Sequence, residues 1–326
     1  MTGPARLLRS ARVVGVALLL AAPLVVPSWA GFLLTVAVAK AAVVLAIALL
    51  LRAGLVSFGH GLYVAAGAYA AGLAMRWAGL HDALLLTGLG VVTAAAVAAV
   101  VGLLVARYRG IFFGMLNLAL SMVAYAVLLK AYDLTGGTDG IGIRTPRFLG
   151  VTPGRDALAV VHAYYALALV LPAFYVVHRV WASPLGYMLR AIRDNEVRVE
   201  YMGASVRRAI YAAYVLSGAL AGLGGVLTAF RVGHIVPEVA YWTTSGEFVF
   251  VAVFGGPGSI GGPLVGSIAY EFLKSYAGKY AVDTWQMVLG LMLLVVILFL
   301  PGGLVSLYDL AVGRGRRWNR SSKPAA

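Results

Sequence analysis

Long apolar segments, separated by short links that carry Arg and Lys, run through almost the whole chain. A helix needs about 20 apolar residues to cross the hydrocarbon core of a bilayer, because each residue advances it by about 1.5 Å. Only 12% of the residues are charged, which is about half the share found in a soluble domain. The pattern excludes a soluble enzyme and predicts an all-α, polytopic integral membrane protein.

Ten segments have the apolar character of a membrane span, and two of them are doubtful, so we expect eight to ten transmembrane helices. The segments are 13–29, 31–51, 59–79, 84–106, 111–131, 159–181, 209–230, 244–256, 261–277 and 283–301. The segment 244–256 is too short to cross unaided and ends at Gly255-Gly256-Pro257-Gly258, which predicts a broken or re-entrant segment there. Most links are short, which predicts a single transmembrane domain.

The distribution of Lys and Arg predicts the orientation of these spans. If the N-terminus is cytoplasmic and the spans alternate, 17 of the 26 Lys and Arg residues fall on the cytoplasmic side, in agreement with the positive-inside rule. Both termini are then cytoplasmic, as the segment 1–12 and the tail 302–326. The net charge of +14 follows from this topology, so we expect no nucleic-acid partner. A cleaved signal peptide is an alternative for the start, because three arginines precede the first apolar run.

Two segments outside the spans are long enough to bind other proteins, the extracytoplasmic 132–158 and the cytoplasmic 182–208. In the cytoplasmic segment, Ser183-Pro184 is typical of a helix start, with Ser as the cap. Asp194-Asn195 can cap a second short helix, and Gly203 can end it. Such a helix is marginal alone in water, which favours docking into a partner. A solvated loop whose arginines only set the topology is the alternative.

Asn117, Ser121 and Tyr125 follow one another at four-residue intervals and therefore share one face of a helix. They are candidates for lining a substrate pathway, although hydrogen bonding between helices would also explain them. Glu247, at the start of the broken segment, is a fourth candidate, because a charge inside the membrane needs a partner or water.

Two further features predict contacts between helices. Lys40 lies inside a span and could pair with Glu247 or with Glu271. Gly218 and Gly222 have the four-residue spacing that lets two helices approach closely.

No catalytic or metal-binding motif is present in the sequence. It contains no Cys, its five His are never three or four residues apart, and it lacks the Gly-rich loop that holds the phosphates of ATP. We therefore expect no catalytic residue, no metal and no cofactor in this chain. A stand-alone secondary transporter is the alternative class, but only Glu247 and Glu271 are available as ion sites in the spans.

Four stretches in order together resemble the permease subunits of branched-chain amino-acid ABC importers, in their LivM-type form. They are 56–61 with 67–69, 134–140, 183–196 and 255–263, and the segment 299–304 matches the usual ending of that family. The resemblance implies an ABC importer permease fold in a bacterial-type cytoplasmic (inner) membrane. The implied substrate is a branched-chain or other hydrophobic amino acid, with urea or a short amide as the alternative.

The resemblance also implies partners. A second, related permease subunit, two cytoplasmic ATPase subunits and an extracytoplasmic substrate-binding protein would complete the transporter. Residues expected to couple the chain to the ATPase are Arg193, Asp194, Glu196, Val197, Glu200, Tyr201 and Gly203. Residues expected on the binding-protein side are Thr135, Gly136, Gly137, Thr138 and Asp139.

Overall fold

The computed structural model describes residues 15, 17, 19–148, 150–281, 283–300 and 302–311. The predicted cytoplasmic segment 1–12 and the part of the predicted tail after residue 311 lie outside these residues. Within the first predicted span, residues 19–25 are helical, and the helix is interrupted at Val26-Pro27.

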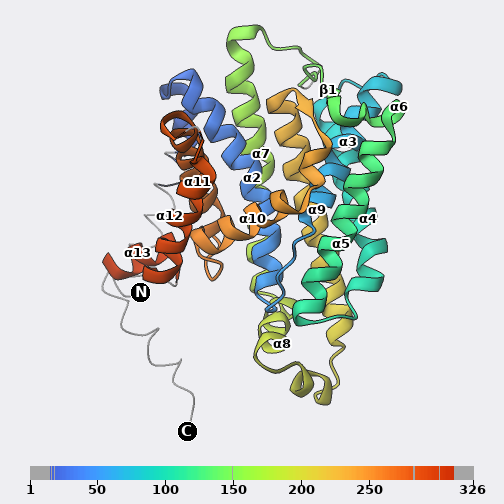
Figure 1. The fold of residues 1–326 in the computed structure, drawn as a ribbon, viewed down its shortest axis with the longest axis vertical. Coiled ribbons are helices and arrows are strands. Elements are labelled where there is room, and N and C mark those ends of the chain that lie inside the picture. The colour runs from blue at the N-terminus through green and yellow to red at the C-terminus, as the bar shows by residue number, and fades with distance from the viewer. Residues whose placement is uncertain are drawn as a thin grey trace.

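The described chain is almost entirely α-helical (Figure 1). The long helices are α2 (Ser28–Leu51), α3 (His60–Trp77), α4 (Ala83–Val105), α5 (Gly110–Lys130), α7 (Arg155–Trp181), α8 (Pro184–Tyr201), α9 (Val206–Val232), α10 (Trp242–Gly255), α11 (Gly262–Tyr280) and α12 (Trp285–Phe299). The short elements are α6 (Tyr132–Thr135), the 3-10 turns η1 (Gly137–Asp139) and η2 (Pro237–Ala240), and α13 (Leu304–Ala311). Each predicted span from residue 31 onward coincides with a helix, to within four residues at either end. Five helices (α2, α4, α5, α7 and α9) are long and apolar enough to cross a membrane, which confirms an all-α, polytopic membrane protein.

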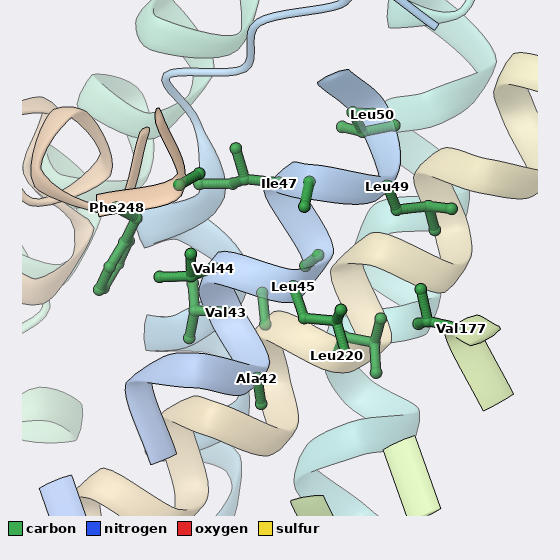
Figure 2. Packing of buried hydrophobic residues seen from close by; sticks show 14 of the residues in the cluster. Ala42, Val43, Val44, Leu45, Ile47, Leu49, Leu50, Val177, Leu220 and Phe248 are labelled. Atoms are coloured by element: carbon green, nitrogen blue, oxygen red, sulfur yellow. The ribbon is translucent and has the colours of Figure 1, made fainter. Parts of the chain in front are cut away.

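Helix α2 forms the centre of the bundle. Apart from Ser28, Thr35 and Lys40 its side chains are apolar on all sides, and every residue from Ala37 to Leu50 is buried, as expected for a helix surrounded by others. It packs against α9, α11, α7 and α10. Figure 2 shows the α2 residues Ala42 to Leu50 among Val177 of α7, Leu220 of α9 and Phe248 of α10.

Glycines bring α3, α4 and α9 into close contact. A Cβ atom on Gly67 of α3 would lie 2.5 Å from the carbonyl oxygen of Gly222 on α9. A Cβ atom on Gly90 of α4 would lie 2.7 Å from the carbonyl oxygen of Gly67. Gly218 and Gly222 face Ala98 and Ala94 of α4. The prediction of close helix packing at Gly218 and Gly222 is therefore confirmed, and van der Waals contact is what holds membrane helices together.

The outer faces of α4 and α5 are apolar and exposed. Within their most apolar windows, only 28% and 22% of the residues are buried. Val92 and Val100 of α4 and Ile111, Phe112 and Val123 of α5 are all more than half exposed. A surface of this kind is typical of contact with the membrane interior or with another membrane protein.

The two segments predicted to lie outside the spans occupy opposite ends of the molecule (Figure 1). One end is formed by α8. The other carries α6 and a small antiparallel pair, in which β1 (Ile141–Gly142) lies beside β2 (His234–Ile235). The predicted loop 132–158 is therefore partly structured, and its last residues belong to α7, because that helix already begins at Arg155.

The predicted break between the eighth and ninth spans is present. Helix α10 has 14 residues and is about 21 Å long, too short to cross a bilayer. The turn after α10 packs against the turn between α12 and α13, because a Cβ atom on Gly256 would lie 2.5 Å from the carbonyl oxygen of Gly302. Gly256 itself has φ +107°, a conformation that glycine adopts without steric cost. Glycine is therefore required where these two interruptions meet.

Candidate coupling surface and buried polar centre

Helix α8 consists of two helical parts. Asn195 between them has φ −165° and ψ 101°, which is not helical, and its Oδ1 accepts a hydrogen bond from the backbone N–H of Arg198 at 3.0 Å. The second part ends at Tyr201, and Gly203 follows with φ +82°, the left-handed conformation typical of a helix end. The predicted two-part helix with an Asn cap and a Gly stop is confirmed.

The predicted cap at the start of α8 is wrong in its detail. Ser183 precedes the helix and Pro184 is its first residue. The Ser183 hydroxyl, however, donates to the carbonyl oxygen of Val180 at 2.7 Å and caps none of the free N–H groups of α8. The close return of the chain after α7 explains this, because it places the end of α7 within reach of the hydroxyl.

The second part of α8 presents apolar side chains to the outside. Tyr201 is 88% exposed, Met202 80% and Val197 56%. Of the other predicted coupling residues, Arg193, Asp194, Glu200 and Gly203 are exposed and Glu196 is half-buried. Large apolar side chains exposed outside the membrane-spanning part of a protein are typical of a surface that binds another protein.

Arg52, which the sequence analysis treated only as a topology signal, anchors the first part of α8. Its Nε donates to the carbonyl oxygen of Gly186 at 3.1 Å, and its guanidinium lies 4.6 Å from the centre of the Trp181 ring. Leu189 and Ile192 of the same part of α8 are buried. The first part of α8 is thus held against the ends of α2 and α7.

A buried polar centre lies on the inward face of α5. Asn117 is 1% exposed, and its Nδ2 donates to the carbonyl oxygen of Phe113 at 2.8 Å. Its Oδ1 accepts a hydrogen bond from the hydroxyl of Tyr214 on α9, which is 2.6 Å from the hydroxyl of Tyr63 on α3. The Ser121 hydroxyl donates to the carbonyl oxygen of Ala240 at 2.7 Å.

Tyr125 continues the same face, with its ring 5.0 Å from that of Tyr241. The structure therefore places Asn117, Ser121 and Tyr125 on one inward face, as their spacing predicts. The polar groups of Asn117 and Ser121 bond to neighbouring helices in this conformation, and their role in a substrate pathway stays a prediction.

The link expected between the second and third spans, 52–58, reaches into the bundle beside this centre, which the sequence did not predict. Residues 52–59 are not helical, and a Cβ atom on Gly59 would lie 2.6 Å from the carbonyl oxygen of Asn117, about two turns into α5. Helix α3 therefore begins deep inside the bundle. Its second residue, Gly61, donates its N–H to the Ser245 hydroxyl near the start of α10 at 2.8 Å. The glycines of Gly59-His60-Gly61 within an apolar region were the signal, since the same feature revealed the break after Gly255.

His60 is fully buried at this point. Its Nδ1 lies 3.0 Å from the Ser57 hydroxyl, and its Nε2 has no hydrogen-bond partner within the described structure. Irregular backbone at membrane depth is tolerated only where protein or a cavity surrounds it. Starts of interrupted helices often mark the substrate sites of membrane transporters, so Ser57, His60 and Ser245 join the candidate residues.

Glu247 does not join the polar centre. It forms ion pairs with Lys40 on α2 and with Lys274 on α11, the latter at 3.1 Å. Lys40 also pairs with Glu271 on α11, so the two alternatives for Lys40 both occur. Lys40 and Glu271 are 8% and 7% exposed. These four residues, called the charge cluster below, balance one another's charge and connect α10 with α2 and α11.

The residues predicted on the binding-protein side divide into two groups. Thr135 and Gly137 are buried, and the Thr135 hydroxyl donates to the carbonyl oxygen of Ala131 at 2.8 Å. Gly136 has φ +73° in the turn after α6. Only Thr138 and Asp139 are exposed at the end opposite α8, so these two can contact another protein in this conformation.

Comparisons with known proteins agree with this architecture. The family described as the permease component of branched-chain amino acid transport systems matches residues 30–297. The chain is 29% identical over 273 residues to the high-affinity branched-chain amino acid transport system permease protein LivM of Escherichia coli (strain K12), which covers 77% of this chain and 64% of LivM. It is 25% identical over 272 residues to LivH of the same strain, covering 77% of this chain and 86% of LivH.

A probable LivM protein of Methanocaldococcus jannaschii is 25% identical over 214 residues, covering 61% of each chain. The chain thus spans less than two thirds of the length of the LivM proteins that it matches. No solved structure matches it significantly. The family match includes α2 from residue 30 and all of α3 to α11, and with them the two-part helix α8, the polar centre and the charge cluster. The chain therefore belongs to the family of permease components of branched-chain amino acid transport systems.

Proposed function

We propose that this chain is the transmembrane permease subunit of an ATP-driven importer for branched-chain or other hydrophobic amino acids. The family match and the names of the LivM and LivH relatives support this function. The membrane is the cytoplasmic (inner) membrane of a bacterial-type cell, with both termini on the cytoplasmic side, because Lys and Arg concentrate there in the predicted topology.

Two cytoplasmic ATPase subunits, a second, related permease subunit and an extracytoplasmic binding protein complete this transporter. The observation that carries the proposal is the second part of α8, which presents Val197, Tyr201 and Met202 at one end of the molecule. A helix this short, capped by Asn195 and ended by Gly203, is marginal alone in water, which favours its docking into a partner. Its apolar residues fit a groove on an ATPase subunit.

The Tyr201→Asp, Met202→Asp double variant tests the docking surface. Loss of two exposed anchor residues is expected to weaken ATPase binding about 30-fold, since an aromatic anchor at an interface contributes about 2 kcal/mol or more. The measurement is co-purification of the ATPase subunits with the tagged permease, together with ATP-coupled leucine uptake in proteoliposomes.

Val151→Asp is the matched control. Val151 is 66% exposed and lies between β1 and α7, far along the chain from α8. Its co-purification with the ATPase should equal that of the unmodified chain. Normal ATPase binding by the Tyr201→Asp, Met202→Asp variant would show that α8 is not the docking element.

A further inference from the structure

The two parts of α8 are attached to different pairs of helices. The first part contacts the ends of α2 and α7 through Arg52, which donates to the carbonyl oxygen of Gly186 and lies over the Trp181 ring. Helix α8 as a whole also packs against α7 and α9. Arg193, two residues before Asn195, packs its side chain against Gly54 in the link between α2 and α3. The first part of α8 is therefore expected to move together with the ends of α2 and α7.

The second part is attached to the link between α4 and α5. Glu196 is the first residue after the non-helical Asn195, and its Oε2 accepts a hydrogen bond from Nε of Arg109 at 2.7 Å. Nη1 of Arg109 donates at the same time to the carbonyl oxygens of Ala106 and Tyr108, at 2.9 and 2.8 Å. One guanidinium thus joins the end of α4, the start of α5 and the second part of α8.

Helix α5 leads from Arg109 directly to the polar centre. Asn117 follows eight residues later, about 12 Å along the helix, and Ser121 lies one turn beyond. Gly114, between Arg109 and Asn117, packs close to the carbonyl oxygen of Val56 in the irregular segment 52–59. A displacement of the start of α5 would therefore change the contacts that α5 makes with the start of α3.

We propose that Arg109 is a positioning residue that transmits movement of the second part of α8 to α5 and the polar centre. Asn195 separates this part from the anchored first part, so the second part can move with the ATPase while the first stays with α2 and α7. This inference rests on the proposed function. The side chains of Arg109 and Glu196 are 27% and 41% exposed, and an ion pair this accessible adds little to folding stability. Loss of the pair should therefore affect coupling far more than folding.

The experiment uses the complete transporter, reconstituted with its ATPase subunits, second permease subunit and binding protein. We compare Glu196→Arg, Arg109→Glu and the double variant that exchanges the two charges. Each single variant places like charges together, and the number of amino acids imported per ATP hydrolysed is expected to fall about five-fold or more, the lower end of measured coupling between sites. The double variant restores opposite charges and is expected to recover most of this ratio.

Arg107→Glu is the matched control, because Arg107 lies in the same link, is exposed and forms no ion pair among the described residues. It should leave the transport ratio unchanged. If Glu196→Arg transports normally, or if the double variant is no better than either single variant, Arg109 acts only as a cap on α4 and the proposal is overturned. Failure of the proposed function gives a different result, since the Tyr201→Asp, Met202→Asp variant would then bind the ATPase normally.

Discussion

Replacing Lys40 with Met is expected to destabilise the folded protein by about 3–5 kcal/mol, because it leaves a buried carboxylate without its partner. Glu271 loses the only ion-pair partner that it has among the described residues and is 7% exposed. Glu247 keeps Lys274 at 3.1 Å. The loss therefore comes mainly from the uncompensated charge of Glu271. Thermal unfolding of the detergent-solubilised permease, followed by the loss of the monodisperse peak in gel filtration, measures the effect.

A second substitution should reverse much of this loss. In the Lys40→Met, Glu271→Gln double variant, the remaining pair of Glu247 and Lys274 is balanced, so most of the stability should return. Lys274→Met alone should cost less than Lys40→Met, because the Lys274 side chain is 35% exposed and Glu247 retains Lys40. Equal stability of Lys40→Met and the unmodified protein would show that the ion pair of Lys40 with Glu271 does not stabilise the packing of α2 on α11.

Substitution of Gly90 by Leu is expected to prevent the close packing of α4 on α3 and α9. The first added carbon would already lie 2.7 Å from the carbonyl oxygen of Gly67, in the backbone of α3. A backbone atom in a packed helix cannot rotate away as a side chain can, so the helices must separate. Overpacking of this kind lowers the free energy of unfolding by about 1–3 kcal/mol and occasionally more. We expect the loss for Gly90→Leu to be at or above the upper end of that range.

Gly88→Leu on the same helix is the control. No atom of a neighbouring helix lies within 4 Å of a Cβ atom built on Gly88, and the residue is exposed on the apolar face of α4. Both variants gain the same helix propensity, so any difference between them reports packing alone. Yield of folded protein and unfolding temperature in detergent provide the comparison. Equal values for the two variants would contradict the close contact of α3 with α4.

Several features of the fold depend only on short stretches of the chain. The spans from residue 31 onward were predictable because lipid imposes a length and an apolar composition on each helix. The break after Gly255, the non-helical Asn195 and the left-handed Gly203 were predictable as well, since each depends on the conformations open to a few neighbouring residues. The error at Ser183 is of another kind. A hydroxyl can both donate and accept, and Ser183 donates back to Val180 in the last turn of α7 without accepting from an N–H of α8; the residue types alone do not fix which of these bonds forms.

The polar residues show the limit of such local reasoning. The four-residue spacing of Asn117, Ser121 and Tyr125 predicted their common face, but not the hydrogen bond from Tyr214, which lies 97 residues away along the chain. Lys40 could be assigned two partners, and the sequence contained nothing to choose between them. The link between Arg109 and Glu196 was not predicted either, because each residue was explained by topology or docking alone.

The order of helices, their apolar character, the positions of their interruptions and the excess of positive charge at one side follow from the residues themselves, because each depends on short stretches of chain and on the solvent around them. The depth at which α3 begins, the pairing of all four members of the charge cluster and the attachment of the two parts of α8 to different helices were decided only by tertiary structure. These features depend on distances between segments far apart in the sequence, and such distances are set when the glycine-lined helices pack together.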